Sequence, residues 1–148
     1  MKDQVTEIVI EKADIHSKEA AELINELSET LNSITGNSGR GSFDNSDMTI
    51  FVIAREAGKA VGCGASREIS QDTAEIKRMY ARKISSGIGK SILNYLEAKE
   101  NGFRRIILET RKCNEKAVEF YLYNGYKVIP SYGKYEKMPE AICFEKQL

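Results

Sequence analysis

The chain has few of the residues that build metal sites and disulfide frameworks. Its 148 residues include one histidine and three cysteines, Cys63, Cys113 and Cys143. Cysteines that are odd in number and far apart fit neither a disulfide scaffold nor a zinc site. We therefore expect no metal, a reducing cytoplasmic location, and cysteines that serve mainly as small buried side chains. The single His16 precedes a predicted helix and is expected to be an exposed flanking residue.

The sequence also lacks a charge excess and a long apolar run. Its 22 Lys and Arg balance 22 Asp and Glu, which argues against nucleic acid as a partner, because general nucleic-acid binders need a net basic face. No apolar run approaches the roughly 18 residues of a membrane span, and the alternating, charged N-terminus does not resemble a signal peptide. A composition of 41% hydrophobic and 30% charged residues predicts one domain over residues 1–148 with a sizeable core.

Apolar periodicity and turn residues predict an alternating series of strands and helices. Strands are expected at residues 5–11, 49–55, 59–67, 73–81, 105–110, 126–129 and 141–146. Helices are expected after Ser17, after Gly87 with an end near Asn101 and Gly102, and from Asn114 to Asn124. A Gly- and Ser-rich loop covers residues 34–47. This order indicates an α/β fold, and residues 73–110 have the form of a right-handed parallel strand–helix–strand unit.

The most informative stretch is a basic turn rich in Ser and Gly that opens into a helix at residues 87–90. Unpaired amides and the positive end of the helix dipole make such a turn a site for an anion such as phosphate. It is not a nucleotide-binding P-loop, because Ile84 occupies the position of the required glycine. It is not a dinucleotide fingerprint either, because no third glycine follows at the required spacing.

A second segment, NEKAVEFYLYNGY at residues 114–126, places Asn114, Ala117 and Tyr121 on one helix face. A small residue between two polar residues makes a groove that a thin, extended ligand could cross. The alternative is an ordinary amphipathic helix that packs Val118 and Phe120 inward.

Four segments in order resemble the GNAT family of acetyl-CoA-dependent N-acetyltransferases: AEIKRMYARK (74–83), GIGKSIL (87–93), N-x-x-A-x-x-F-Y-x-x-x-G-Y (114–126) and IPSYGKYEKMPEAICFEK (129–146). The resemblance runs from about residue 8 to the C-terminus. It implies a mixed, mostly antiparallel sheet flanked by helices. It also implies one parallel pair, residues 73–81 and 105–110, that splays to admit acetyl-CoA.

The resemblance assigns the cofactor site to three regions. The backbone of residues 79–81 and the face of Asn114 and Ala117 would hold the pantetheine arm, and the start of the helix at residue 87 would hold the pyrophosphate. The family carries Arg or Gln where this chain has Ile84, so Arg82 or Lys83 is expected to replace that group. The expected cofactor residues are Met79, Tyr80, Ala81, Arg82, Lys83, Gly87, Ile88, Gly89, Lys90, Asn114, Ala117 and Tyr121.

The resemblance also assigns the chemistry, which is direct acetyl transfer to a primary amine of a small molecule or peptide. Tyr121 would protonate the leaving thiolate, since a phenol holds its proton at neutral pH. Glu75 occupies the position of a general base in several family members, and Glu109 is the competing candidate. Glu75 has two alternatives: a solvent-facing strand residue, or a partner of Lys77 or Arg78.

The acceptor is less defined. Arg40, Asp44, Asp47, Tyr132 and Tyr135 are the candidate contacts. The carboxylates would suit a polyamine, and Arg40 would suit an amino-acid carboxylate. The alternative function is a CoA-binding sensor or interaction module without transferase activity. The resemblance further implies a homodimer, with residues 141–146 as the exposed sheet edge.

Overall fold

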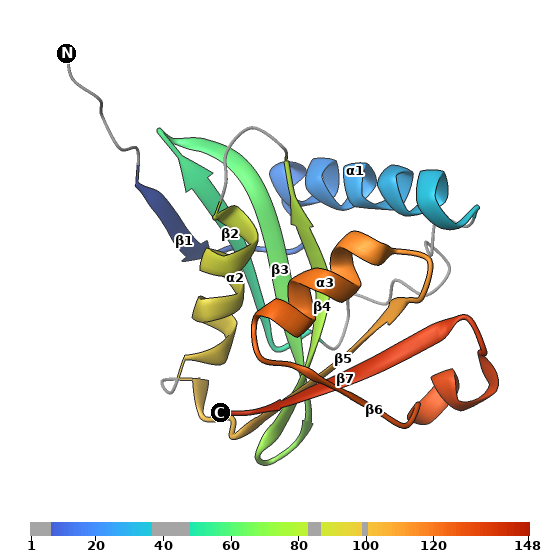
Figure 1. The fold of residues 1–148 in the computed structure, drawn as a ribbon. Helices are drawn as coiled ribbons and strands as arrows, with labels where there is room; N and C mark the ends of the chain where they lie inside the picture. Colours follow the sequence, from blue (N-terminus) through green and yellow to red (C-terminus); the bar gives the residue numbers. More distant parts are fainter. Residues whose placement is uncertain (1–6, 37–47, 83–86, 99–100) are drawn as a thin grey trace.

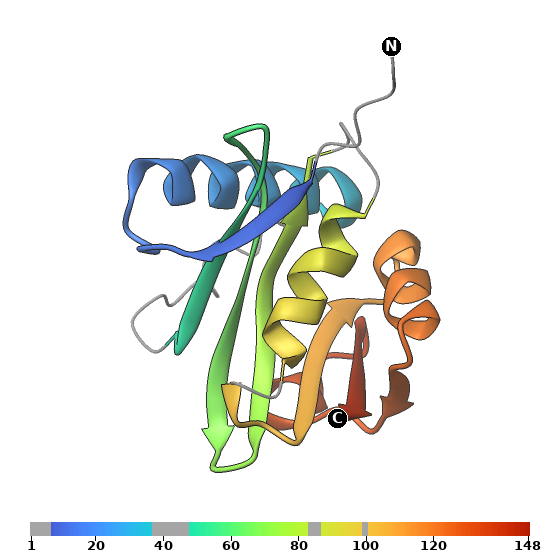
Figure 2. The same cartoon turned by 90° about the vertical axis from the view of Figure 1, so that its left-hand side faces the viewer.

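The computed structural model describes residues 7–36, 48–82, 87–98 and 101–148. These residues form one sheet with helices on its two faces (Figures 1 and 2). Along the chain the elements are β1 (Ile8–Lys12), α1 (Lys18–Thr35), β2 (Ile50–Glu56), β3 (Lys59–Ser70), β4 (Thr73–Ala81), α2 (Ile88–Glu97), β5 (Arg105–Arg111), α3 (Glu115–Tyr123), β6 (Lys127–Ile129), η3 (Gly133–Lys137) and β7 (Ala141–Gln147).

The sheet has the order β1-β2-β3-β4-β5-β7-β6, and β4 with β5 is its one parallel pair within the described chain. That pair is short: it runs from Thr73 opposite Arg105 to Glu75 opposite Ile107. Beyond these three positions the two strands diverge (Figure 1). The predicted fold, a mostly antiparallel sheet with one splayed parallel pair, is confirmed.

A bulge in β4 helps to separate the strands. Cys63 pairs with Tyr80 and Ala65 pairs with Lys77, so two residues of β4, Arg78 and Met79, lie opposite Gly64 alone. Arg78 has φ +59°, an uncommon value for a residue with a side chain. A bulge of this kind bends the strand and increases its twist, which turns residues 79–81 away from β5.

The faces of the sheet are covered by different elements. On one face α2 and α3 cover a core that includes Ile76, Ile92, Leu108 and Phe144. On the other face, α1 packs its Leu23 against β2 and β3. The same face of the C-terminal half is covered by η3, in a smaller cluster of Tyr135, Ala141 and Cys143. The cleft described below lies where these packed regions meet.

Local capping explains most helix ends. The Ser17 side chain accepts from the Ala20 amide at the start of α1, and Asn114 accepts from the Ala117 amide at the start of α3. The predicted end of α2 near Asn101 and Gly102 is wrong, because the helix ends at Glu97. The Asn101 side-chain amide donates to the Tyr95 carbonyl (2.8 Å), so it caps the helix from outside instead of extending it.

Two further expectations need correction. Strand β7 is not an edge, because it pairs with β5 on one side and with β6 on the other. The edge beside it is the three-residue β6, and dimerisation stays a prediction. Cys63 and Cys143 are buried as expected, but Cys113 is exposed. His16 is exposed, as predicted. No helix in the described ranges has the length and apolarity needed to cross a membrane.

Candidate active site

A cleft of about 1370 Å³ opens where β4 and β5 diverge. Its walls come from the second half of β4, the end of β5, α3, the last turns of α1, one residue of α2, and Tyr135 of η3 with Met138 and Glu140 after it. The structure brings together seven of the residues predicted to hold the cofactor, all lining this cleft: Met79, Tyr80, Ala81, Gly89, Asn114, Ala117 and Tyr121. Because β5 pairs only with residues 73–75 of β4, the backbone of residues 79–81 faces the cleft without a strand partner from β5.

The start of α2 lies beside the cleft. Gly87 has φ +87° and provides no side-chain cap. An alanine methyl at Gly89 would lie 3.2 Å from the Phe120 ring, so this glycine lets α2 approach α3 closely. The Ile88 side chain points into the core with 1% of its surface exposed, and the Lys90 ammonium donates to the Asn124 amide oxygen (3.3 Å). Among the described residues of this turn, the backbone groups and the exposed Lys90 ammonium are the candidates to hold an anion, and that role stays a prediction.

Arg82 is engaged with α1. Its guanidinium donates to both carboxylate oxygens of Glu26 (2.8 and 2.6 Å) and to the Ala60 carbonyl (2.6 Å). The Tyr80 hydroxyl donates to the same Glu26 (3.0 Å). The hydrogen bond from Arg82 is the main reason that the pKa of Glu26 lies below its usual value. Arg82 would have to leave Glu26 to reach a phosphate; Lys83 and Ile84 lie outside the described residues.

Tyr121 is buried at the inner end of the α3 face, with 7% of its surface exposed. Its ring packs edge-on against Phe120 and Tyr126, with centroids 5.2 and 5.6 Å apart. Burial raises the pKa of the Tyr121 phenol above its ordinary value, so the group is protonated at neutral pH. Within the described part of the chain, the hydrogen bonds do not include its hydroxyl, which leaves the proton available to a molecule in the cleft.

The two carboxylates proposed as bases lie in different cavities. Glu109 lines the cleft with Tyr121. Burial raises the pKa of Glu109, opposed by its ion pair with Arg111. Glu75 instead lines a second cavity, of about 610 Å³, on the face covered by η3.

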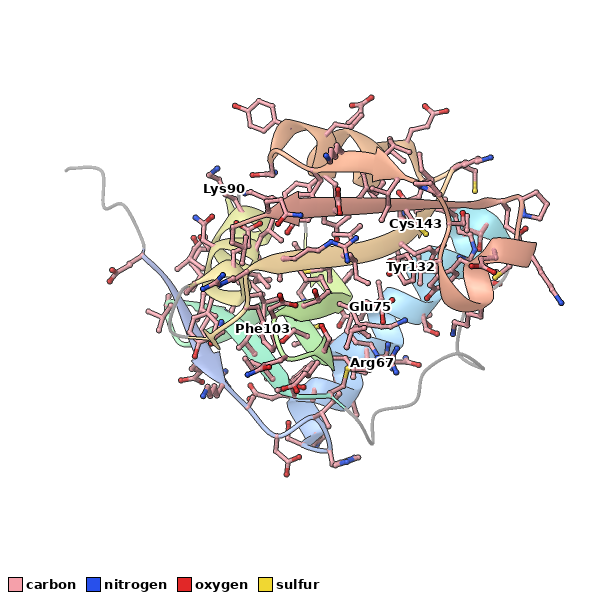
Figure 3. The ribbon with its side chains drawn as sticks, turned by 90° about the horizontal axis from the view of Figure 1, so that it is seen from below. Arg67, Glu75, Lys90, Phe103, Tyr132 and Cys143 are labelled. Carbon is pink, nitrogen blue, oxygen red and sulfur yellow. The ribbon has the colours of Figure 1, made fainter. Side chains whose placement is uncertain are left out.

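Glu75 is buried, with 2% of its surface exposed, so the solvent-facing alternative is wrong. It accepts from the Tyr132 hydroxyl (2.6 Å) and from Arg67 (3.1 Å), and the Lys77 ammonium lies 3.8 Å away. Figure 3 shows Glu75 between Tyr132 and Arg67. These contacts tie Glu75 to β3 and to the segment that leads into η3.

The two tyrosines predicted as acceptor contacts join η3 to β4. Tyr132 donates to Glu75 as described, and Tyr135 accepts from Lys77 (3.0 Å). Their rings meet edge-on at 5.5 Å. Tyr135 lines both cavities, so it lies between them. The other candidate contacts, Arg40, Asp44 and Asp47, lie outside the described residues.

Sequence motifs did not point to Arg67 and Glu26, although each holds a predicted site residue in place. No sequence signal indicated Arg67, because a register shift between Glu68 and Ser70 brings it opposite Glu75. Within the described ranges no group of three or more His, Cys, Asp and Glu side chains is placed to hold a metal ion. Chemistry without a metal stays a prediction.

Comparison with known proteins agrees with this geometry. The family model described as Acetyltransferase (GNAT) family matches residues 14–126. An "IAA acetyltransferase" of Azospirillum brasilense is 32% identical over 106 residues, which are 66% of this chain and 67% of that protein. The "Uncharacterized N-acetyltransferase YsnE" of Bacillus subtilis is 30% identical over 104 residues, 66% of this chain and 69% of that one.

Solved structures show the same fold. A Klebsiella pneumoniae protein assigned as an acyl-CoA N-acyltransferase superposes with a TM-score of 0.80 at 26% identity, covering 95% of this chain and 97% of the other. The PaiA N-acetyltransferase of Thermoplasma acidophilum, solved with coenzyme A, superposes at 0.70 with 21% identity over 96% and 99% of the two chains. The fold and the cleft define an acyl-CoA-dependent N-acyltransferase. The chain belongs to the GNAT acetyltransferase family.

Proposed function

We propose that the protein transfers an acetyl group from acetyl-CoA to a primary amine by direct attack in the cleft between β4 and β5. The observation that carries this proposal is the three-position pairing of β4 with β5. It opens a cleft that residues 79–81 of β4 line on one side and the buried Tyr121 lines on another.

The donor would lie along β4. The pantetheine arm carries amide groups, and residues 79–81 would pair with them as one strand pairs with another. The side of α3 that carries Asn114 and Ala117 would form the opposite wall, and the amides at the start of α2 would hold the pyrophosphate. Relatives of this fold from Thermoplasma acidophilum and Elizabethkingia anophelis were solved with coenzyme A and acetyl-CoA, respectively. Those complexes support acetyl-CoA as a ligand of this fold.

The chemistry needs two proton transfers. The neutral amine attacks the thioester carbonyl, a C–N bond forms, and a β4 amide near residues 79–81 stabilises the oxyanion. The C–S bond then breaks, and Tyr121 gives its proton to the leaving thiolate. The amine loses its own proton to a base.

Glu109 is the base that the geometry favours, because it shares the cleft with Tyr121, and burial raises its pKa toward the range of a useful base. Glu75, the residue indicated by the family resemblance, accepts hydrogen bonds from Arg67 and Tyr132 in the second cavity. Its part is then to hold η3 against β4.

The proposal is tested by calorimetry with acetyl-CoA and by thiol release over amino acids, polyamines, aminoglycosides and peptides. Tyr121→Phe should lower turnover about tenfold or more and leave acetyl-CoA affinity unchanged. The matched control is Tyr123→Phe on the same helix, since Tyr123 is 86% exposed.

Glu109→Gln should lower kcat and shift its pH profile, whereas Glu75→Gln should act mainly on acceptor KM. An unchanged rate in Tyr121→Phe would remove Tyr121 from its role. Tight acetyl-CoA binding without thiol release for any amine would indicate a CoA-binding module instead of a transferase. Absence of both acetyl-CoA binding and thiol release would refute the proposal.

A further inference from the structure

The second cavity is strongly cationic. Among the described residues that line it, Arg67, Lys77, Arg78 and Lys134 carry positive charge and Glu75 alone carries negative charge, a net charge of three. The large cleft differs, because its lining residues include both cations and carboxylates in similar numbers. A chain with zero net charge therefore concentrates positive charge in one hollow.

The cations converge on one buried ring. The Lys77 and Lys134 ammoniums lie 5.6 and 5.5 Å from the centroid of the Tyr135 ring. Glu75 is already engaged by Arg67, Lys77 and Tyr132, and the ion pairs found within the described ranges do not involve Lys134. Burial, with repulsion from Lys134, Arg78 and Arg67, lowers the pKa of Lys77 although Glu75 opposes the shift. An anion in this hollow would relieve that repulsion.

The hollow adjoins the cleft, because Lys77, Arg78 and Tyr135 line both. Lys77 lies two residues before Met79 on β4, on the other side of the bulge at Arg78. The walls between the charges are apolar, formed by Met48, Ile69 and Ile107. An acceptor with its amine in the cleft could therefore place a second group, several bonds away, among the cations.

We propose that the acceptor is an amine that also carries a carboxylate, such as an ω-amino acid or a short peptide, and that Lys77 and Lys134 receive this carboxylate. A carboxylate accepts charge-assisted hydrogen bonds from ammonium groups, and the alkyl part of the acceptor would lie on the apolar wall. A polyamine would instead be repelled at this place, because its second ammonium group would lie among the cations of the second cavity. The inference deepens the proposed function and rests on it.

The kinetic test compares acceptors that differ only in the carboxylate. Thiol release is measured with a series of ω-amino acids of increasing length, each against the alkylamine of equal length. The carboxylate form should give the higher kcat/KM once the chain is long enough to reach from the cleft to Lys134, through a lower KM.

The variant test uses two lysines of η3. Lys134→Gln should reduce the preference for the carboxylate form by about three- to tenfold and leave the rate with the alkylamine unchanged. Lys137→Gln is the matched control, because Lys137 is also exposed on η3 and lines neither cavity. Equal use of both acceptor forms, or equal effects of both variants, would overturn the inference.

A binding measurement separates this inference from the proposed function. N-acetyl-6-aminohexanoate and its amide are titrated into the protein by calorimetry. The carboxylate should bind more tightly, and Lys134→Gln should remove the difference. If Lys134→Gln removes the difference in affinity while no amine releases thiol, the anion site is supported and the proposed transferase activity is refuted. If amines are acetylated but the two titrations are alike, the transferase stands and the anion site is refuted.

Discussion

Gly64 on β3 lies directly beneath α2, and replacing it with alanine is the sharpest test of how the helix is seated. An alanine methyl there would lie 2.5 Å from Ile92 Cγ2, 2.8 Å from Met79 Sδ and 3.3 Å from Leu96 Cδ1. Carbon atoms in contact normally lie about 3.5–4.0 Å apart, so Ile92 would have to retreat by about 1 Å. Met79 can rotate away, but the β-branched Ile92 is stiff on a helix.

Overpacking of this kind costs about 1–3 kcal/mol. Alanine also lowers the conformational entropy of the unfolded chain, which stabilises the folded state by up to about 1 kcal/mol where the backbone accepts alanine. We therefore expect Gly64→Ala to lower the free energy of unfolding by about 1–2 kcal/mol, which for a chain of this length lowers the Tm by roughly 2–8 °C.

Urea unfolding of four proteins tests the reasoning: wild type, Gly64→Ala, Ile92→Ala and the double variant. The single Ile92→Ala change should cost about 2–5 kcal/mol, because it leaves a cavity. In the double variant the new methyl no longer meets Cγ2. The loss of unfolding free energy in the double variant should therefore be smaller, by about 1 kcal/mol, than the sum of the losses in the two single variants. Additive costs, or a Gly64→Ala protein as stable as wild type, would refute the clash.

Two predictions concern titratable groups. The lowered pKa of Glu26 means that its contribution to folding is present at neutral pH and is lost as the pH falls below its ordinary value of 4.5; the gap in urea midpoint between wild type and Glu26→Gln should therefore shrink on acidification, and a pH-independent gap would contradict this. Because burial raises the pKa of Cys63 to about 12 and Cys113 is the exposed cysteine, mass spectrometry should find native alkylation at Cys113 alone and at all three cysteines after unfolding. Acetyl-CoA should slow the native reaction, since Cys113 lines the cleft; rapid native alkylation of Cys63 would contradict the burial.

Features that depend on neighbours in the sequence were predictable. The strand predicted at residues 73–81 has the bounds observed for β4, and the side chains of Ser17 and Asn114 cap the helices that follow them. The splayed parallel pair followed from the family resemblance. The Asn114, Ala117 and Tyr121 face was predicted from helical spacing, and all three residues line the cleft.

Features that depend on distant contacts were not predictable. Arg67 faces Glu75 only because the register of β3 and β4 shifts between Glu68 and Ser70. A regular hairpin would put a different residue opposite Glu75. Glu26 reaches Arg82 across 56 positions of sequence, and no local pattern specifies that pair. The end of α2 was wrong for a similar reason, because the Asn101 side chain caps carbonyls that a longer helix would have used internally.

The short pairing between β4 and β5 makes the stability of the folded protein depend on the concentration of the acyl donor. With the donor bound as proposed, its pantetheine arm pairs with β4 where β5 turns away. Ligand contacts then stabilise the folded state but not the unfolded state. Resistance to heat and proteases would then grow with the logarithm of donor concentration, about 1.4 kcal/mol per tenfold excess over Kd. A cell short of acyl thioesters would hold this enzyme not only idle but more easily degraded.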